Sequence, residues 1–326
     1  MDTTSHHVLM LLVDNTAALK QHFPWQQPML RRYAALLYAS AGREADIGAI
    51  DACMDLIKQE TGAFSMFRGY VKLSMAAMLS LCDEPERVFS DTLQVYVQLK
   101  DVRFHASEYL VLAAYQIARQ VPVERQAEAV ARTRAFYEAM KEEHRFITGY
   151  DDYIFSAMLG ISELDVSEGC ERMERVFQEL KPVFASRNGL QGMSQVLALF
   201  PEDDAVSRAV ALHDALKTRD FNFSRGEALS TLGVLALLDG ETASIAQEVA
   251  DTYEELRAQK GFGPLSVQKL ERMLLAASLI ACGRLQAGGQ SALTTALATS
   301  ITNILIAQQV AMAAVLASAA ASSAAN

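Results

Sequence analysis

Residues 146–184 read FITGYDDYIFSAMLGISELDVSEGCERMERVFQELKPVF. The stretch opens on an aromatic residue and a glycine turn, continues as an apolar segment, and then passes through an acidic turn. Its second half, residues 167–181, places apolar side chains at the i, i+3, i+4 and i+7 spacing of one helix face, and Pro182 ends that helix. The stretch therefore predicts two consecutive helices, a helical hairpin. The apolar face of the second helix consists of Met173, Val176, Phe177 and Leu180.

Looser copies of this hairpin follow one another along most of the chain. In each copy an apolar residue followed by a base ends the second helix, and an aromatic residue opens the next copy. The copies are about forty residues apart, which is a period typical of helical-hairpin repeats. The pairs that end the second helix are Ile57-Lys58, Leu99-Lys100, Met140-Lys141, Leu180-Lys181, Leu216-Lys217 and Leu256-Arg257. The opening aromatic residues are Phe64, Phe104, Phe146, Phe184, Phe221 and Phe262.

These markers predict an all-α protein. We expect a right-handed array of about seven helical hairpins, in the manner of an α-solenoid or α/α superhelix. Residues 1–284 are expected to form this repeat domain, in which residues 1–24 are an N-terminal capping helix. Residues 285–326 carry no charged side chain and are rich in alanine, so we expect a separate C-terminal helix there.

The alanine-rich C-terminal segment allows three placements. It can pack in a groove of the protein or against a partner copy, which would make a homo-oligomer, or it can be a frayed end. Residues 301–321 are also long enough to cross a bilayer, but this segment contains Asn303, Gln308 and Gln309 and has no flanking Lys or Arg. We favour packing over membrane insertion.

The charge of the chain excludes some partners. A net charge of −10, from 39 acidic and 29 basic residues, argues against nucleic acid and against an anionic membrane surface as partners.

The apolar run at residues 8–13 is too short for a signal peptide and has no basic residues before it. The four cysteines are far apart and form no C-x-x-C pair, which is typical of reduced, mostly buried thiols. We therefore expect a cytoplasmic protein.

The turns that open the hairpins carry the most unusual polar residues. Equivalent turns of a repeat array lie along one edge, so these residues are expected to form a shared surface for a ligand or partner. Helix capping is the other interpretation, because Ser65, Asp151 and Ser224 come close to helix starts. The candidate ligand-binding residues are Phe67, Arg68, Asp151, Asp152, Tyr153, Asn188, Gln191 and Arg225.

Arg68 is the most informative of these candidates. A cation at the start of a helix opposes the helix dipole, so we expect Arg68 to need a partner that its local structure does not supply. The carboxylates of Asp151 and Asp152, two hairpins later, are the internal candidates. An anionic ligand is the alternative.

Five dispersed motifs together resemble one known family. The resemblance is to the bacterial domain-of-unknown-function 4003 family, and it covers nearly the whole chain. It implies a cytoplasmic bacterial protein of this size, and it implies no activity, so no catalytic residue can be carried over. The motifs are T-G-x-F-S-x-F-R-G at 61–69, D-D-Y at 151–153, N-G-L-Q at 188–191, Q-K-G-F-G at 259–263 and I-A-Q-Q at 306–309.

Motifs of known chemistry are absent from the sequence. It contains no nucleotide-binding loop, hydrolase elbow or zinc-protease motif, and its histidines lack metal-ligand spacing. The acidic clusters at 151–152 and 202–204 do not extend to D-D-x-x-D. We therefore predict no catalytic residue, no metal and no cofactor.

Two function classes follow from these observations. The first is a non-enzymatic binding or scaffold protein, whose inner face and turn edge hold a peptide, a partner helix, another protein or a small anionic ligand. The alternative is an enzyme of unknown reaction with its site at the mouth of a closed toroid of helices.

Overall fold

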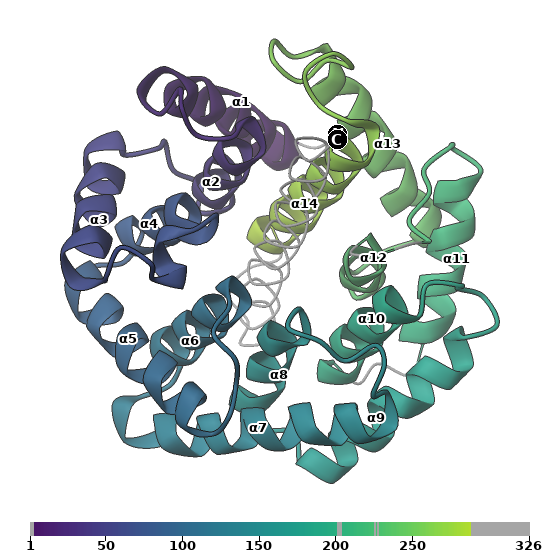
Figure 1. Ribbon diagram of the computed structural model, residues 1–326. Helices are drawn as coiled ribbons and strands as arrows, with labels where there is room; N and C mark the ends of the chain where they lie inside the picture. Colours follow the sequence, from purple (N-terminus) through teal and green to yellow (C-terminus); the bar gives the residue numbers. More distant parts are fainter. Residues whose placement is uncertain (1–2, 201–203, 225, 227, 288–326) are drawn as a thin grey trace, which may run out of the picture. The chain divides into compact units, whose positions relative to one another are not determined.

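The structure is a computed structural model that describes residues 3–200, 204–224, 226 and 228–287. Within these ranges the chain forms fourteen α-helices and two short 3-10 helices, and it forms no β-strand (Figure 1). The prediction of an all-α protein is therefore confirmed.

The helices follow one another with short connections. Their bounds are α1 Thr3–His22, α2 Pro28–Ser40, α3 Ile47–Glu60, η1 Met66–Arg68, α4 Val71–Ser80, α5 Pro85–Asp101, α6 Glu108–Gln120, η2 Val123–Arg125, α7 Gln126–Glu143, α8 Asp152–Ile161, α9 Val166–Leu180, α10 Arg187–Leu199, α11 Ala205–Lys217, α12 Ala228–Ala236, α13 Thr242–Ala258 and α14 Lys269–Ala287.

The described helices form two compact units. One unit consists of residues 14–163 and the other of residues 3–13 with residues 164–287. Helix α1 contributes its first half to the second of these units and its remainder to the first. It lies within residues 1–24, where we expected an N-terminal helix, and its apolar residues Val8, Leu12 and Leu19 are buried.

In the unit of residues 14–163, even-numbered and odd-numbered helices form separate layers. Helix α2 packs on α4, α4 on α6 and α6 on α8, while α3 packs on α5 and α5 on α7 (Figure 1). The sequence explains the difference between the layers. Helix α8 is apolar around most of its circumference and is buried from Asp152 to Gly160, whereas α5 buries one face only.

The other unit repeats this pattern of contacts. Helix α10 packs on α12 and α12 on α14, while α9 packs on α11 and α11 on α13. Helix α9 has one buried face, and the four apolar residues predicted for it are all buried. The two helices predicted within residues 146–184 are accordingly present as α8 and α9, and they belong to different units.

Two odd-numbered helices end in the same type of turn. Arg103 after α5 and Asp220 after α11 have φ angles of 70° and 64°, in the left-handed region. The next residue then donates its N–H to a carbonyl in the last helical turn, Phe104 to Leu99 and Phe221 to Leu216, at 3.1 Å in both cases. Each turn directs its phenylalanine ring into the core, where both rings are buried.

Ala157 on α8 lies in the core of the unit of residues 14–163. Its side chain is fully buried beside Ala114, Leu110 and Tyr153. We expect Ala157→Phe to lower the free energy of unfolding by about 1–3 kcal/mol, because the added ring must displace packed neighbours. Thermal unfolding followed by circular dichroism measures this loss. An unchanged melting temperature would contradict the close helix contact at this position.

The predicted C-terminal helix of residues 285–326 falls largely outside the described residues. Helix α14 continues past the expected boundary at residue 284 to Ala287, and residues 288–326 lie beyond the described part of the chain. The separate C-terminal helix and the homo-oligomer that it would form therefore stay predictions. Among the helices that the structure describes, none is long and apolar enough to cross a membrane.

Candidate functional site

Phe67, the first candidate from the sequence, is a core residue. Its side chain is 1% exposed and packs edge-on against Phe89 and Tyr96, with ring centroids 5.6 and 5.1 Å away. The neighbouring Phe64, which we expected to open this hairpin, is fully exposed instead. The proposed cap at Ser65 is confirmed, because its hydroxyl accepts the N–H of Phe67 at 3.3 Å.

Arg68 has a local partner, so the expectation that it lacks one is wrong. Its Nε donates to the hydroxyl of Thr61 at 3.2 Å, and its Nη2 donates to the carbonyl oxygens of Lys58 and Thr61. These carbonyls lie at the C-terminal end of α3, the negative end of that helix dipole. The short helix η1 turns the guanidinium back onto α3. Among the described residues, no ion pair joins Arg68 to Asp151 or Asp152.

Asp152 and Tyr153 are held within the fold at the start of α8. The Asp152 carboxylate is 3% exposed and accepts the backbone N–H of Gly149 at 2.8 Å. Asp151 precedes the helix, but its side chain makes no capping bond to α8, contrary to the capping interpretation. The Tyr153 hydroxyl accepts the N–H of His105 at 3.3 Å, and burial raises the pKa of Tyr153 to about 12.

The remaining candidates belong to the unit that contains α10. Asn188 is exposed and Gln191 is buried, both on α10. Arg225 lies outside the described residues. In the unit of residues 14–163, Phe67 and Tyr153 belong to separate aromatic clusters. The ligand-binding role of these candidates therefore stays a prediction.

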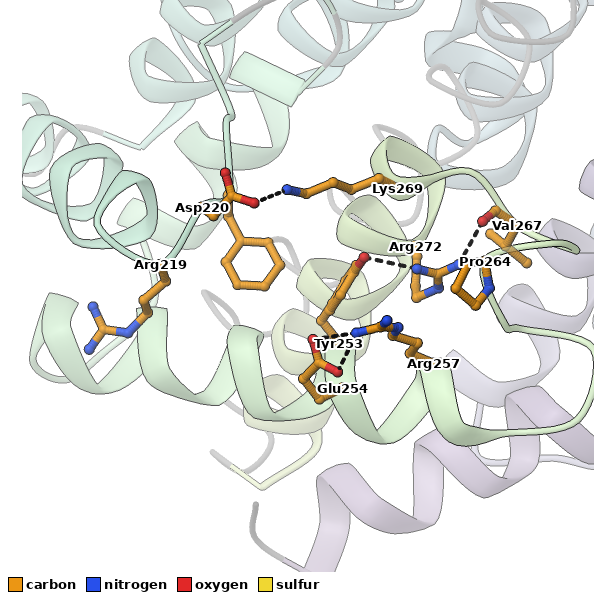
Figure 2. Close-up of a pocket in the computed structure, with 10 residues that line it drawn as sticks. Arg219, Asp220, Tyr253, Glu254, Arg257, Pro264, Val267, Lys269 and Arg272 are labelled. Atoms are coloured by element: carbon orange, nitrogen blue, oxygen red, sulfur yellow. Dashed lines mark hydrogen bonds and ion pairs between the residues drawn. The ribbon is translucent and has the colours of Figure 1, made fainter.

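A pocket of about 430 Å³ lies in the unit of residues 3–13 and 164–287 (Figure 2). It is formed by the turn after α11, the second half of α13, the loop before α14 and the first turn of α14. A volume of this size is typical of sites for small molecules. The lining residues are Arg219, Asp220, Phe221, Tyr253, Glu254, Arg257, Pro264, Val267, Lys269 and Arg272.

The pocket carries positive charge. Among the described residues that line it, four are basic and two are acidic. The Arg219 guanidinium turns away from the others (Figure 2), so the side chains that face the pocket leave an excess of one positive charge. The chain as a whole has a net charge of −10. The local charge is therefore opposite in sign to that of the protein, which is typical of sites that attract anions.

Arg272 shapes the pocket from within. Its side chain is 2% exposed, and it donates hydrogen bonds to the carbonyl of Phe262 at 2.7 Å, the carbonyl of Val267 at 2.6 Å and the hydroxyl of Tyr253 at 2.8 Å. Its guanidinium also lies over the Tyr253 ring, 5.1 Å from the centroid. All three acceptors are neutral. Within the described part of the chain, no carboxylate neutralises this buried cation.

The other bases of the pocket have partners that are easily exchanged. Lys269 pairs with Asp220, and Arg257 pairs with Glu254 at 3.2 Å (Figure 2). The side chains of both pairs are about half exposed or more. Exposed ion pairs contribute only about 0–1 kcal/mol, so a bound anion can replace either carboxylate at little cost.

Only some of the residues that line this pocket stood out in the sequence. Phe221 and Arg257 are markers of the forty-residue repeat. Lys269 and Arg272 were not among the predicted site residues. Their i, i+3 spacing at the start of an apolar helix places two bases on one helix face, and this spacing is the signal that could have found them.

The described residues offer no other obvious chemistry. No group of three or more His, Cys, Asp and Glu side chains among them is placed to hold a metal ion. The four cysteines are free thiols, and Cys53 and Cys282 are buried. Burial raises the pKa of Cys53 to about 11 and that of Cys282 to about 12, so both thiols stay protonated near neutral pH.

The described residues form an all-helical protein with a basic cavity lined by α13, α14 and the segments that follow α11 and α13. The chain belongs to the family described as protein of unknown function (DUF4003), whose model matches residues 15–311. The family resemblance carried by the five sequence motifs is therefore confirmed. No curated protein matches the chain, and no solved structure does so.

Proposed function

We propose that this is a non-enzymatic binding protein. Its helical hairpins form a repeat array of period about forty residues, and the basic pocket of α11, α13 and α14 holds a small anionic ligand. The proposal has two parts, the scaffold and the ligand, and separate observations support each of them.

Recurring ring contacts support the repeat array. An aromatic residue shortly before an even-numbered helix packs against the aromatic or histidine ring near the end of the following odd-numbered helix. In three of these contacts it is the predicted opening residue, and in the fourth it is Phe67, which follows the exposed Phe64. This contact occurs at least four times, with centroid distances between 4.9 and 5.3 Å. The pairs are Phe67 with Tyr96, Phe104 with Tyr137, Phe184 with His213 and Phe221 with Tyr253.

A recurring arginine contact supports the array independently. An arginine on an odd-numbered helix donates to a carbonyl at the C-terminal end of the next even-numbered helix. Arg132 donates to Gly160 at 3.0 Å, Arg172 to Ala198 at 3.1 Å and Arg208 to Ala236 at 2.8 Å. A cation at that end satisfies free carbonyls and complements the helix dipole. Structural copies of one hairpin are expected to share such a contact.

The excess of positive charge in the pocket is the observation that carries the ligand proposal. Arg257 and Lys269 reach solvent at its mouth, and Arg272 adds a buried positive charge. Of the ligands considered from the sequence, a small anion fits this pocket best. Binding of a peptide, partner helix or other protein, an enzymatic role in a closed toroid, and a cytoplasmic location stay predictions from the sequence.

A thermal-shift screen of small carboxylates, phosphates and sulfates on the whole protein tests this function. We expect at least one anion to raise the melting temperature of the wild type, because a ligand that binds only the folded state stabilises it. The same anion is expected to lose most of its effect on Lys269→Gln, which removes one positive charge from the mouth of the pocket.

Lys58→Gln is the matched control for this screen. Lys58 has the same side-chain exposure as Lys269, 51%, and is likewise paired with an aspartate, but it lies on α3 in the other unit. We expect its response to anions to equal that of the wild type. A screen without any stabilising anion, or equal losses in both variants, would contradict the proposed site.

A further inference from the structure

The pocket of α11, α13 and α14 already holds an internal anion at its mouth. The Asp220 carboxylate pairs with Lys269, and its side chain is 95% exposed. Asp220 lies in the turn after α11, outside any helix. It can therefore leave Lys269 without exposing apolar surface, and a ligand anion can take its place.

The charges that remain after this exchange favour a dianion. Arg219 turns away from the pocket and donates to Gln247 at 3.2 Å and to the Ala215 carbonyl at 2.7 Å (Figure 2). Once Asp220 is displaced, the described side chains that face the pocket include three bases and one acid, Glu254. The bases are Arg257, Lys269 and Arg272. The excess is two positive charges. A monoanion would only replace the displaced carboxylate, whereas a dianion neutralises the excess.

Part of the lining is apolar. Phe221, Tyr253 and Val267 are all buried, and the rings of Phe221 and Tyr253 meet edge-on with centroids 4.9 Å apart. Pro264 completes this part at the exposed end. The cavity thus has room for an apolar or aromatic body attached to the anionic group.

We infer that the ligand is a small phosphomonoester with an apolar or aromatic body, and that it binds by displacing Asp220 from Lys269. The inference rests on the proposed anion-binding function. A phosphomonoester carries about −1.5 to −2 charges at pH 7 and has three acceptor oxygens. Its oxygens can accept from the planar Arg257 guanidinium and the Lys269 ammonium at the same time.

Isothermal titration of the whole protein with four probes tests the ligand class. The probes are phenyl phosphate, inorganic phosphate, benzoate and succinate at one fixed salt concentration. We expect phenyl phosphate to bind about tenfold more tightly than benzoate, because its second charge adds charge-assisted hydrogen bonds. Phenyl phosphate should also bind more tightly than inorganic phosphate, which lacks the ring. It should bind more tightly than succinate, whose two charges lie on separate carboxylates and not on one group with three oxygens.

Asp220→Asn tests the exchange at Lys269. Asparagine has the same shape and tolerates the left-handed backbone of this position. Because the internal competitor is removed, we expect phenyl phosphate to bind up to about fivefold more tightly. Asp214→Asn is the matched control: Asp214 is exposed on α11 and does not line the pocket, so the same change of charge should leave the affinity nearly unchanged.

The outcomes separate the ligand class from the proposed function. If benzoate or succinate binds as tightly as phenyl phosphate, and still depends on Lys269, the phosphomonoester inference is overturned while anion binding stands. If Asp220→Asn binds no more tightly than Asp214→Asn, the exchange is overturned. If none of the four probes binds, the proposed function fails as well.

Discussion

Replacing Arg272 by methionine is expected to lower the free energy of unfolding by about 3 kcal/mol or more. The buried guanidinium holds the carbonyls of Phe262 and Val267 and the hydroxyl of Tyr253. Methionine fills similar space but donates no hydrogen bond, so all three acceptors lose this partner inside the protein. Urea unfolding followed by circular dichroism measures the loss.

Arg257→Met is the matched control for this substitution. Arg257 lines the same pocket, but its side chain is about half exposed and pairs with Glu254 one turn away on α13. We expect a loss of only about 0–1 kcal/mol, as for other exposed ion pairs. Equal losses for the two variants would show that Arg272 does not hold the loop between α13 and α14.

Replacing Gly160 by alanine is the second change with a large expected effect. A Cβ at this position of α8 would lie 2.3 Å from the Thr133 hydroxyl oxygen and 2.7 Å from the Thr133 backbone nitrogen. Because α7 presents backbone here, a side-chain rotation cannot relieve the clash. We expect a loss of about 3 kcal/mol, the upper end of the range for overpacking, in thermal or urea unfolding.

Gly48→Ala is expected to change stability in the opposite direction. Gly48 is also a helical glycine, but it is exposed on α3, and a Cβ there would meet only the Asp46 carboxylate at 3.6 Å. Alanine should therefore stabilise the protein by about 0.5–1 kcal/mol, since it restricts the unfolded chain and favours the helix. If Gly160→Ala raises the midpoint as Gly48→Ala is expected to do, the close approach of α7 and α8 is contradicted.

The helices and their buried faces could largely be predicted from the sequence. The spacing of Met173, Val176, Phe177 and Leu180 placed one face of α9 in the core, and all four are buried. Helical periodicity is a local property, so it survives in the sequence without knowledge of any neighbour. The opening aromatic residues were a weaker guide, because Phe64 and Phe146 are fully exposed while Phe67 and Tyr153 are buried nearby.

The pocket could not be predicted in the same way. It joins Asp220 to Lys269, residues 49 positions apart, and its partners come from two helices and two connecting segments. The electrostatic expectation for Arg68 was wrong for a related reason. The sequence showed a cation at a helix start, but the direction in which η1 turns the guanidinium depends on where α3 ends.

Composition and spacing were enough to predict that the chain is helical, that α9 has a buried apolar face, and to which family the chain belongs. These properties depend on composition and on spacing within about forty residues. Only the packing of the helices shows that Arg272 is buried on neutral acceptors, that Asp220 meets Lys269, and that Arg68 turns back to the end of α3. The physical reason is that charge compensation depends on distances between side chains, and packing between helices sets those distances.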